Sequence, residues 1–232
     1  IGYTYAPNVV GWAWGFNSHG LAQSVNALEP LNVTIGIGIN FLARDVLNAH
    51  SLDDAISRAC VPGVASGQHF NIGSIHDPGR QLLIETSPFG CNVRELKPPL
   101  AAATEDNQVA VAYHCNLYES AKLKGIDGGA AAEPSSAHRM ARLHALPGAR
   151  TMAQLRSVLS DSADQMYPVH RNAQPPDTCM TLNSVIFDTV RNVVAVWGPG
   201  APRSGAARRF FNWSTLTPIS SSSPAIQTWQ DG

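Results

Sequence analysis

Apolar residues near the start of the chain alternate with polar or small ones in two short runs, at residues 9–16 and 21–28. A period of two is typical of β-strands that bury one face. The four residues between the runs, Asn-Ser-His-Gly, favour a tight turn because they form local hydrogen bonds and tolerate positive φ. The pattern therefore predicts an antiparallel hairpin.

The spacing of apolar residues then changes to the helical one. Apolar positions recur every three or four residues at Ile39, Leu42, Val46 and Ala49. Ser51 and Asp54 follow at the spacing of a capping box, in which the side chain of the first residue accepts a hydrogen bond from the backbone N–H of the second. This region predicts two consecutive helices.

Strand patterns return further along the chain, at residues 69–76, 81–88, 92–97, 109–116, 181–188 and 192–198. Between them we expect one helix from about Ser136 to Leu146 and another capped by Thr151. Strands and pairs of helices in this order favour an α+β fold with antiparallel sheets rather than alternating βαβ units. The length favours a single domain, residues 1–232, and the serine-rich end, residues 219–232, is expected to be a mobile tail.

Composition limits the kind of partner. Hydrophobic residues make up 44% of the chain and charged residues only 14%, with a net charge of −1. This balance favours neither nucleic acid nor an anionic membrane surface, and no apolar run approaches the roughly 18 residues of a membrane helix. We find no phosphate-cradling glycine loop and expect no cofactor. A small-molecule partner is predicted, while the cellular compartment stays open.

The cysteines and histidines give no metal-ligand pattern. The four cysteines are widely spaced with no C-x-x-C pair, which argues against a zinc knuckle and leaves one disulfide open: Cys60, Cys91, Cys115 and Cys179. His69 and His76 are seven residues apart, so they would point to opposite faces of a regular strand. We therefore expect no metal site, and we expect each cysteine to be a small buried side chain.

The segment VAYHCNLYES, residues 109–118, places three polar groups directly after a predicted strand. Buried polar groups need partners, so Asn116 either ends the strand in a purely structural role or belongs to a reaction site. Trp12 and Trp14 share one face of the first predicted strand. They could line an acyl or aromatic pocket, or they could be ordinary core residues.

Six segments occur in the order, and at roughly the spacing, of the penicillin acyltransferase family: GFNSHGLAQSVNAL (15–28), INFLARDVLNAHSLDDAISR (39–58), IETSPFG (84–90), HCNLY (114–118), AHRMARL (137–143) and TLNSVIFD (181–188). The chain thus resembles this family from about Gly11 to Trp197. The family is similar to the β-alanyl-dopamine hydrolases and, more distantly, to acid ceramidase and bile-salt hydrolase.

The resemblance implies the N-terminal-nucleophile hydrolase fold, an αββα sandwich of two stacked antiparallel sheets with helices on both outer faces. Members cleave themselves before a cysteine, whose thiol attacks an amide or thioester while its own α-amino group acts as the base. The implied function is a hydrolase or acyltransferase of small N-acyl amides. His114-Cys115-Asn116 matches the family's His-x-Asn pattern, so the resemblance implies that Asn116 donates to the oxyanion and that His114, Trp12 and Trp14 contact substrate.

The chain departs from the family pattern in two places. It begins at Ile1, whereas the segment with the nucleophilic cysteine would lie upstream of the matching part; we expect this segment on a separate processed chain or removed, and this chain alone to be inactive. Thr178 stands where some members carry an arginine, so the substrate cannot be carried over. The alternative is a non-catalytic relative that acts as a binding or assembly module.

Overall fold

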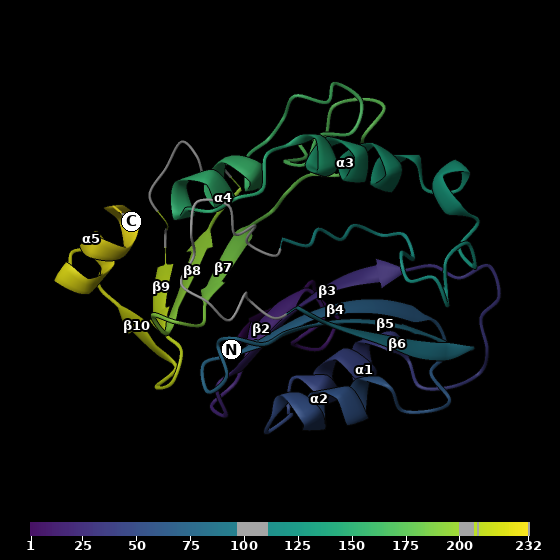
Figure 1. The fold of residues 1–232 in the computed structure, drawn as a ribbon, viewed down its shortest axis with the longest axis horizontal. Coiled ribbons are helices and arrows are strands. Elements are labelled where there is room, and N and C mark those ends of the chain that lie inside the picture. The colour runs from purple at the N-terminus through teal and green to yellow at the C-terminus, as the bar shows by residue number, and fades with distance from the viewer. Residues whose placement is uncertain (97–110, 200–206, 208, 232) are drawn as a thin grey trace.

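The computed structural model describes residues 1–96, 111–199, 207 and 209–231. Within these residues the chain forms two antiparallel sheets, of six and four strands, together with five α-helices. The predicted α+β class is confirmed. Figure 1 shows α1 and α2 beneath the larger sheet and α3 and α4 on the opposite side of the molecule.

The larger sheet is a meander, because each strand pairs with the next one along the chain: β1 (Gly2–Tyr3), β2 (Trp14–Phe16), β3 (Leu21–Leu28), β4 (Gly67–Ser74), β5 (Gln81–Ser87) and β6 (Gly90–Leu96). The predicted first hairpin is present as β2 and β3. Its turn is held by Asn17, whose Oδ1 accepts from the N–H groups of His19 and Leu21. The strand β2 is shorter than the predicted run 9–16, since Gly11 adopts φ +109° and ends the extended backbone.

Two helices, α1 (Ile39–Val46) and α2 (Leu52–Ala59), cover one face of this sheet. Both were predicted, and Ser51 caps α2 by accepting from the N–H of Asp54. Their apolar faces pack against alternate residues of the central strands, among them Phe70, Ile72, Leu82 and Ile84. A disulfide between Cys60 and Cys91 joins the end of α2 to β6, with their Cα atoms 5.4 Å apart.

The smaller sheet has the order β10-β9-β8-β7: β7 (Ser184–Asp188), β8 (Val193–Trp197), β9 (Arg209–Asn212) and β10 (Thr217–Ile219). Alternate residues of β8 point to two different cores. Val194 packs with Trp14, Phe16 and Trp213 against the larger sheet, whereas Val193 and Trp197 face the helices on the other side. Period-two alternation thus places one sheet against the other and leaves the outer face for helices.

Three helices complete the described chain: α3 (Pro134–Ala145), α4 (Met152–Leu159) and α5 (Pro224–Asp231). Thr151 and Gln154 form a capping box at the start of α4, as the position of Thr151 predicted. Both α4 and α5 pack on the outer face of the smaller sheet. Residues 219–232 were expected to form a mobile tail, whereas Ile226 and Trp229 of α5 are buried in the structure.

The strand predicted at residues 109–116 is also wrong where the structure describes it. Residues 109 and 110 lie outside the described residues, and residues 111–116 are irregular. No described strand pairs with them. Side chains take the place of a neighbouring strand, since the N–H of Asn116 donates to Ser136 and the N–H of Tyr118 donates to Asp127. The alternation of apolar and small residues predicted an extended backbone, but it could not show whether a neighbouring strand pairs with this segment.

Candidate functional site

The segment from His114 to Ser120 crosses the end of the larger sheet, on the face opposite α1 and α2. It is fixed there by side-chain hydrogen bonds. The Tyr118 hydroxyl donates to the Thr86 carbonyl at 2.8 Å, and the Asn116 amide nitrogen donates to the Ala27 carbonyl at 2.9 Å. The absence of a side chain at Gly67 makes room for Tyr118, because a Cβ atom at position 67 would overlap the Tyr118 hydroxyl.

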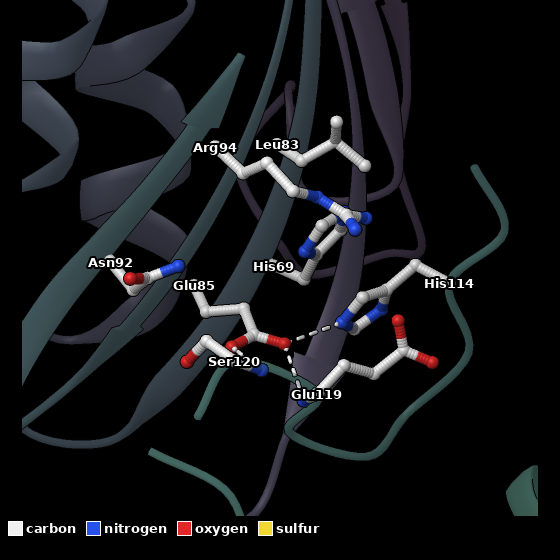
Figure 2. Close-up of a pocket in the computed structure, with 8 residues that line it drawn as sticks. All are labelled: His69, Leu83, Glu85, Asn92, Arg94, His114, Glu119 and Ser120. Carbon is white, nitrogen blue, oxygen red and sulfur yellow. Dashed lines mark hydrogen bonds and ion pairs between the residues drawn. The ribbon is translucent and has the colours of Figure 1, made fainter. Parts of the chain in front are cut away.

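Glu85 of β5 is the centre of this attachment (Figure 2). Its side chain is only 5% exposed, and its two oxygens accept hydrogen bonds from His114 Nε2 at 3.0 Å, the Glu119 N–H at 2.7 Å and the Ser120 N–H at 3.0 Å. Burial alone would raise the pKa of Glu85, but these hydrogen bonds outweigh it and lower the pKa to about 2. The carboxylate is therefore ionised at neutral pH.

Both ring nitrogens of His114 have hydrogen-bond partners. Its Nδ1 lies 2.6 Å from the Cys115 carbonyl and its Nε2 lies 3.0 Å from the Glu85 carboxylate. Both partners are acceptors, so each ring nitrogen of His114 already faces a hydrogen-bond acceptor. The adjacent Cys115 points the other way, into an apolar cluster with Met140 and Leu143 of α3.

His69 of β4 stacks on His114, with ring centroids 3.4 Å apart and the planes 9° from parallel. Its Nε2 faces Asn71 Oδ1 at 3.0 Å, while Asn71 Nδ2 donates to Ser24. With the Asn71 amide in this orientation His69 Nε2 is the donor, and Nδ1 is a buried nitrogen without a hydrogen-bond partner among the described residues. Burial, together with the neighbouring charge of His114, lowers the pKa of His69 to about 3.

Lowering the pH from 6.5 to 5 should destabilise the protein by about 2 kcal/mol through His69. The unfolded histidine takes up a proton below its ordinary pKa of 6.5, whereas the folded ring stays neutral until about pH 3, so stability falls in that window by up to about 1.4 kcal/mol per pH unit. Glu85 does not contribute there, since its lowered pKa gives stability that is lost only below about pH 4.5. Urea unfolding of wild type and His69→Phe at both pH values measures the effect.

The phenyl ring of the variant keeps an aromatic surface against His114 but cannot bind a proton. The exposed His76 supplies the control, because His76→Gln should keep the wild-type dependence on pH. Equal pH dependence in His69→Phe and wild type would show that His69 is protonated in the folded protein.

His69, Glu85 and His114 place three potential metal-ligand atoms within 4.8 Å of one another. Their arrangement is nevertheless unsuited to joint coordination of a metal ion. A metal ion bound by a histidine nitrogen lies close to the plane of the imidazole ring. Two nearly parallel rings 3.4 Å apart share no such position. Arg94 also lines this small cavity of about 70 Å³ and adds positive charge beside it.

Asn116 is held in one orientation by contacts at both ends of its side chain. Its Oδ1 accepts from Arg139 Nη2 at 3.0 Å, and its Nδ2 donates to the Ala27 carbonyl at 2.9 Å. Because the guanidinium can only donate and the carbonyl can only accept, the amide cannot be flipped. One Nδ2 hydrogen remains without a partner among the described residues.

Arg139 of α3 acts as the support of this amide. Its Nη2 also donates to Ser136, which is fully buried, and its Nε donates to the Ser135 carbonyl. Burial lowers the pKa of the Arg139 guanidinium. No carboxylate of the described residues lies within ion-pair distance of it, so its positive charge acts on the Asn116 carbonyl oxygen. This polarises the amide and makes its free N–H a stronger donor.

The sequence-predicted site residues fall into two places. His114 and Asn116 lie on the same segment over the larger sheet. Trp14 is 8% exposed and packs between the two sheets, where its Nε1 donates to Asn183 at 2.7 Å, whereas Trp12 is half-buried just before β2. No local feature of the sequence distinguishes Glu85 or Arg139, although both lie in segments that carry the family resemblance. The spacing of His69 and His76 likewise gives no indication of the contact between His69 and His114.

Residues 1–198 match the acyl-coenzyme A:6-aminopenicillanic acid acyl-transferase family, and the chain belongs to this family. The resemblance drawn from the six sequence segments is thereby confirmed. Membership supports a general acyl-transfer or hydrolase function. No curated protein matches the chain significantly. Among the helices that the structure describes, none is long and apolar enough to cross a membrane.

Proposed function

We propose that the protein hydrolyses small N-acyl amides, or transfers their acyl group, through a cysteine acyl-enzyme in which Asn116 donates to the oxyanion. The proposal rests mainly on one observation, the Asn116 amide fixed between Arg139 and Ala27 with one N–H uncommitted. We also propose that the two sheets and their outer helices form the αββα sandwich of N-terminal-nucleophile hydrolases, to which an upstream segment adds the cysteine.

The chemistry needs a donor that is in place before the reaction begins. When a thiolate attacks the amide carbonyl carbon, the π electrons of the C=O bond move to its oxygen, which becomes an oxyanion. A donor fixed toward that position is worth about 3 kcal/mol of the barrier in related sites. Asn116 meets this requirement because Arg139 and Ala27 hold both ends of its side chain.

The remaining steps belong to the proposed N-terminal cysteine. Its α-amino group takes the thiol proton, and the tetrahedral intermediate then collapses by breaking the C–N bond, with that proton passing to the departing amine. Water attacks the resulting thioester and releases the acid, or a second amine attacks and receives the acyl group. We place hydrolysis ahead of transfer.

Three of the four cysteines of this chain are poor candidates for the nucleophile. Cys60 and Cys91 are joined in a disulfide. Cys115 is buried among apolar side chains, and burial raises the pKa of its thiol, so little thiolate forms. Cys179 is a free and exposed thiol. An experiment must therefore distinguish Cys179 from the proposed nucleophilic cysteine of the upstream segment.

The test measures amine release from N-acyl substrates, including β-alanyl amides and penicillins, by protein that carries the upstream segment. We expect turnover, and mass spectrometry under denaturing conditions should find the acyl group on the cysteine of that segment. The variant Cys179→Ser should retain activity. Loss of turnover in Cys179→Ser, together with the acyl group on Cys179 in the wild-type protein, would contradict the proposal. Absence of turnover with every acyl substrate would favour the alternative of a binding or assembly module.

A further inference from the structure

We infer that Glu85 is a positioning residue for Asn116, and that His114 transmits this effect rather than contacting the reacting atoms. The inference rests on the proposed function, because it assigns Glu85 a role in placing the proposed oxyanion donor. Figure 2 shows the Glu85 carboxylate directed at the segment that carries Asn116, with dashed lines to His114 and Glu119.

The contacts of Glu85 lie on both sides of Asn116 along the chain. His114 precedes Asn116 by two residues, and the bound N–H groups of Glu119 and Ser120 follow it by three and four. One carboxylate therefore closes the loop that presents Asn116. No strand of the described residues pairs with residues 111–116, so these hydrogen bonds hold the segment where sheet pairing would hold a strand.

Charge makes this attachment stronger than ordinary loop contacts. The Glu85 carboxylate is ionised and forms hydrogen bonds with His114 Nε2 and with two backbone N–H groups, and charge-assisted hydrogen bonds are about twice as strong as neutral ones. A glutamine of the same shape would offer one acceptor oxygen and turn an NH₂ group toward at least one of these donors. Glu85→Gln should thus release part of the loop without leaving a cavity.

The face of His114 that would otherwise be open is closed by His69. The ring of His69, stacked at 3.4 Å, shields the hydrogen bond between Glu85 and His114 from water, and the side chain of His114 is only 2% exposed. Both ring nitrogens of His114 are already engaged, so this histidine has no free nitrogen to serve as a general base or to bind substrate. Its geometry fits an anchor beside Asn116.

A double-mutant cycle between Glu85→Gln and Asn116→Ala tests the inference in protein that carries the upstream segment. Alone, Glu85→Gln should lower kcat about 10- to 100-fold with a smaller change in KM, the scale expected when a catalytic group is misplaced by about an ångström. In the Asn116→Ala background it should lower kcat by less than about 3-fold, because there is no donor left to misplace.

Asn92→Ala is the matched control. Asn92 pairs with Glu85 in the register of β5 and β6 and lines the same cavity. It makes no hydrogen bond to the segment from His114 to Ser120, so the kcat of Asn92→Ala should equal that of wild type. Melting temperatures of all variants are measured in parallel. If Glu85→Gln does not fold, the same cycle is run with His114→Gln, which removes only one of the three donors.

The outcomes separate the inference from the proposed function. Effects of Glu85→Gln and Asn116→Ala that multiply fully would give Glu85 a separate structural role and overturn the inference, while the function of Asn116 would stand. A loss of kcat in Glu85→Gln that follows only its unfolded fraction would overturn it as well. Unchanged kcat in Asn116→Ala would remove the proposed oxyanion donor and the inference together.

Discussion

Replacing Asn116 with alanine should lower kcat for amide cleavage about 100- to 1,000-fold in protein that carries the upstream segment. The Asn116 side chain is fixed by Arg139 and by the Ala27 carbonyl, so its free N–H needs no reorganisation to meet the developing oxyanion. Donors of this kind act mainly in the transition state, and their loss therefore appears in kcat more than in KM. Steady-state kinetics on one N-acyl substrate measure both.

The neighbouring Cys115 gives the control for this experiment. Cys115 is next in sequence but points into the cluster formed with α3, so Cys115→Ser should cost packing while leaving kcat close to that of wild type. Asn116→Ala leaves Arg139 without one acceptor, which can lower the melting temperature slightly. If activity falls only in proportion to the melting temperature, Asn116 has a structural role in the loop and no role in catalysis.

The regular elements could be predicted because their patterns are local. Ser51 and Thr151 marked the starts of two helices, and both are capping residues in the structure. The irregular segment could not be predicted in this way. Val111 and Tyr113 alternate with alanines as in a strand, but whether a neighbouring strand exists depends on parts of the fold far away in sequence.

The candidate site shows the same division between local and distant information. The pattern His114-Cys115-Asn116 was found because the family resemblance carries it as a short string. Glu85 lies 29 residues before His114 and occupies an ordinary strand position, so only folding brings the two side chains within 3.0 Å. The stacking of His69 on His114 likewise joins residues whose spacing has no local meaning.

The end of the chain differs from the expected mobile tail for a different reason. The serine run near residue 220 suggested that tail, but a short helical pattern lies beside it. Ile226 and Trp229 are three residues apart, which places both on one face of a helix. In the structure that face is buried on the smaller sheet.

Replacing Trp229 with alanine should destabilise the protein by about 4 kcal/mol, the usual scale for truncating a buried tryptophan. Trp229 is 2% exposed, its ring lies 5.7 Å from that of Phe210, and its Nε1 donates to Asp188 at 3.0 Å. The substitution removes this ring from the outer core of the smaller sheet and leaves Asp188 without one donor. Urea unfolding at neutral pH measures the change in the free energy of unfolding.

Gln227 lies on the exposed side of α5, so Gln227→Ala supplies a control that should stay within about 0.5 kcal/mol of wild type. The contrast between the two variants tests whether α5 is part of the cooperative fold. If Trp229→Ala were also within that range, α5 would contribute nothing to stability, and the original expectation of a mobile tail would describe the protein in solution. A large loss confined to Trp229→Ala instead means that the smaller sheet depends on α5 to bury its outer face.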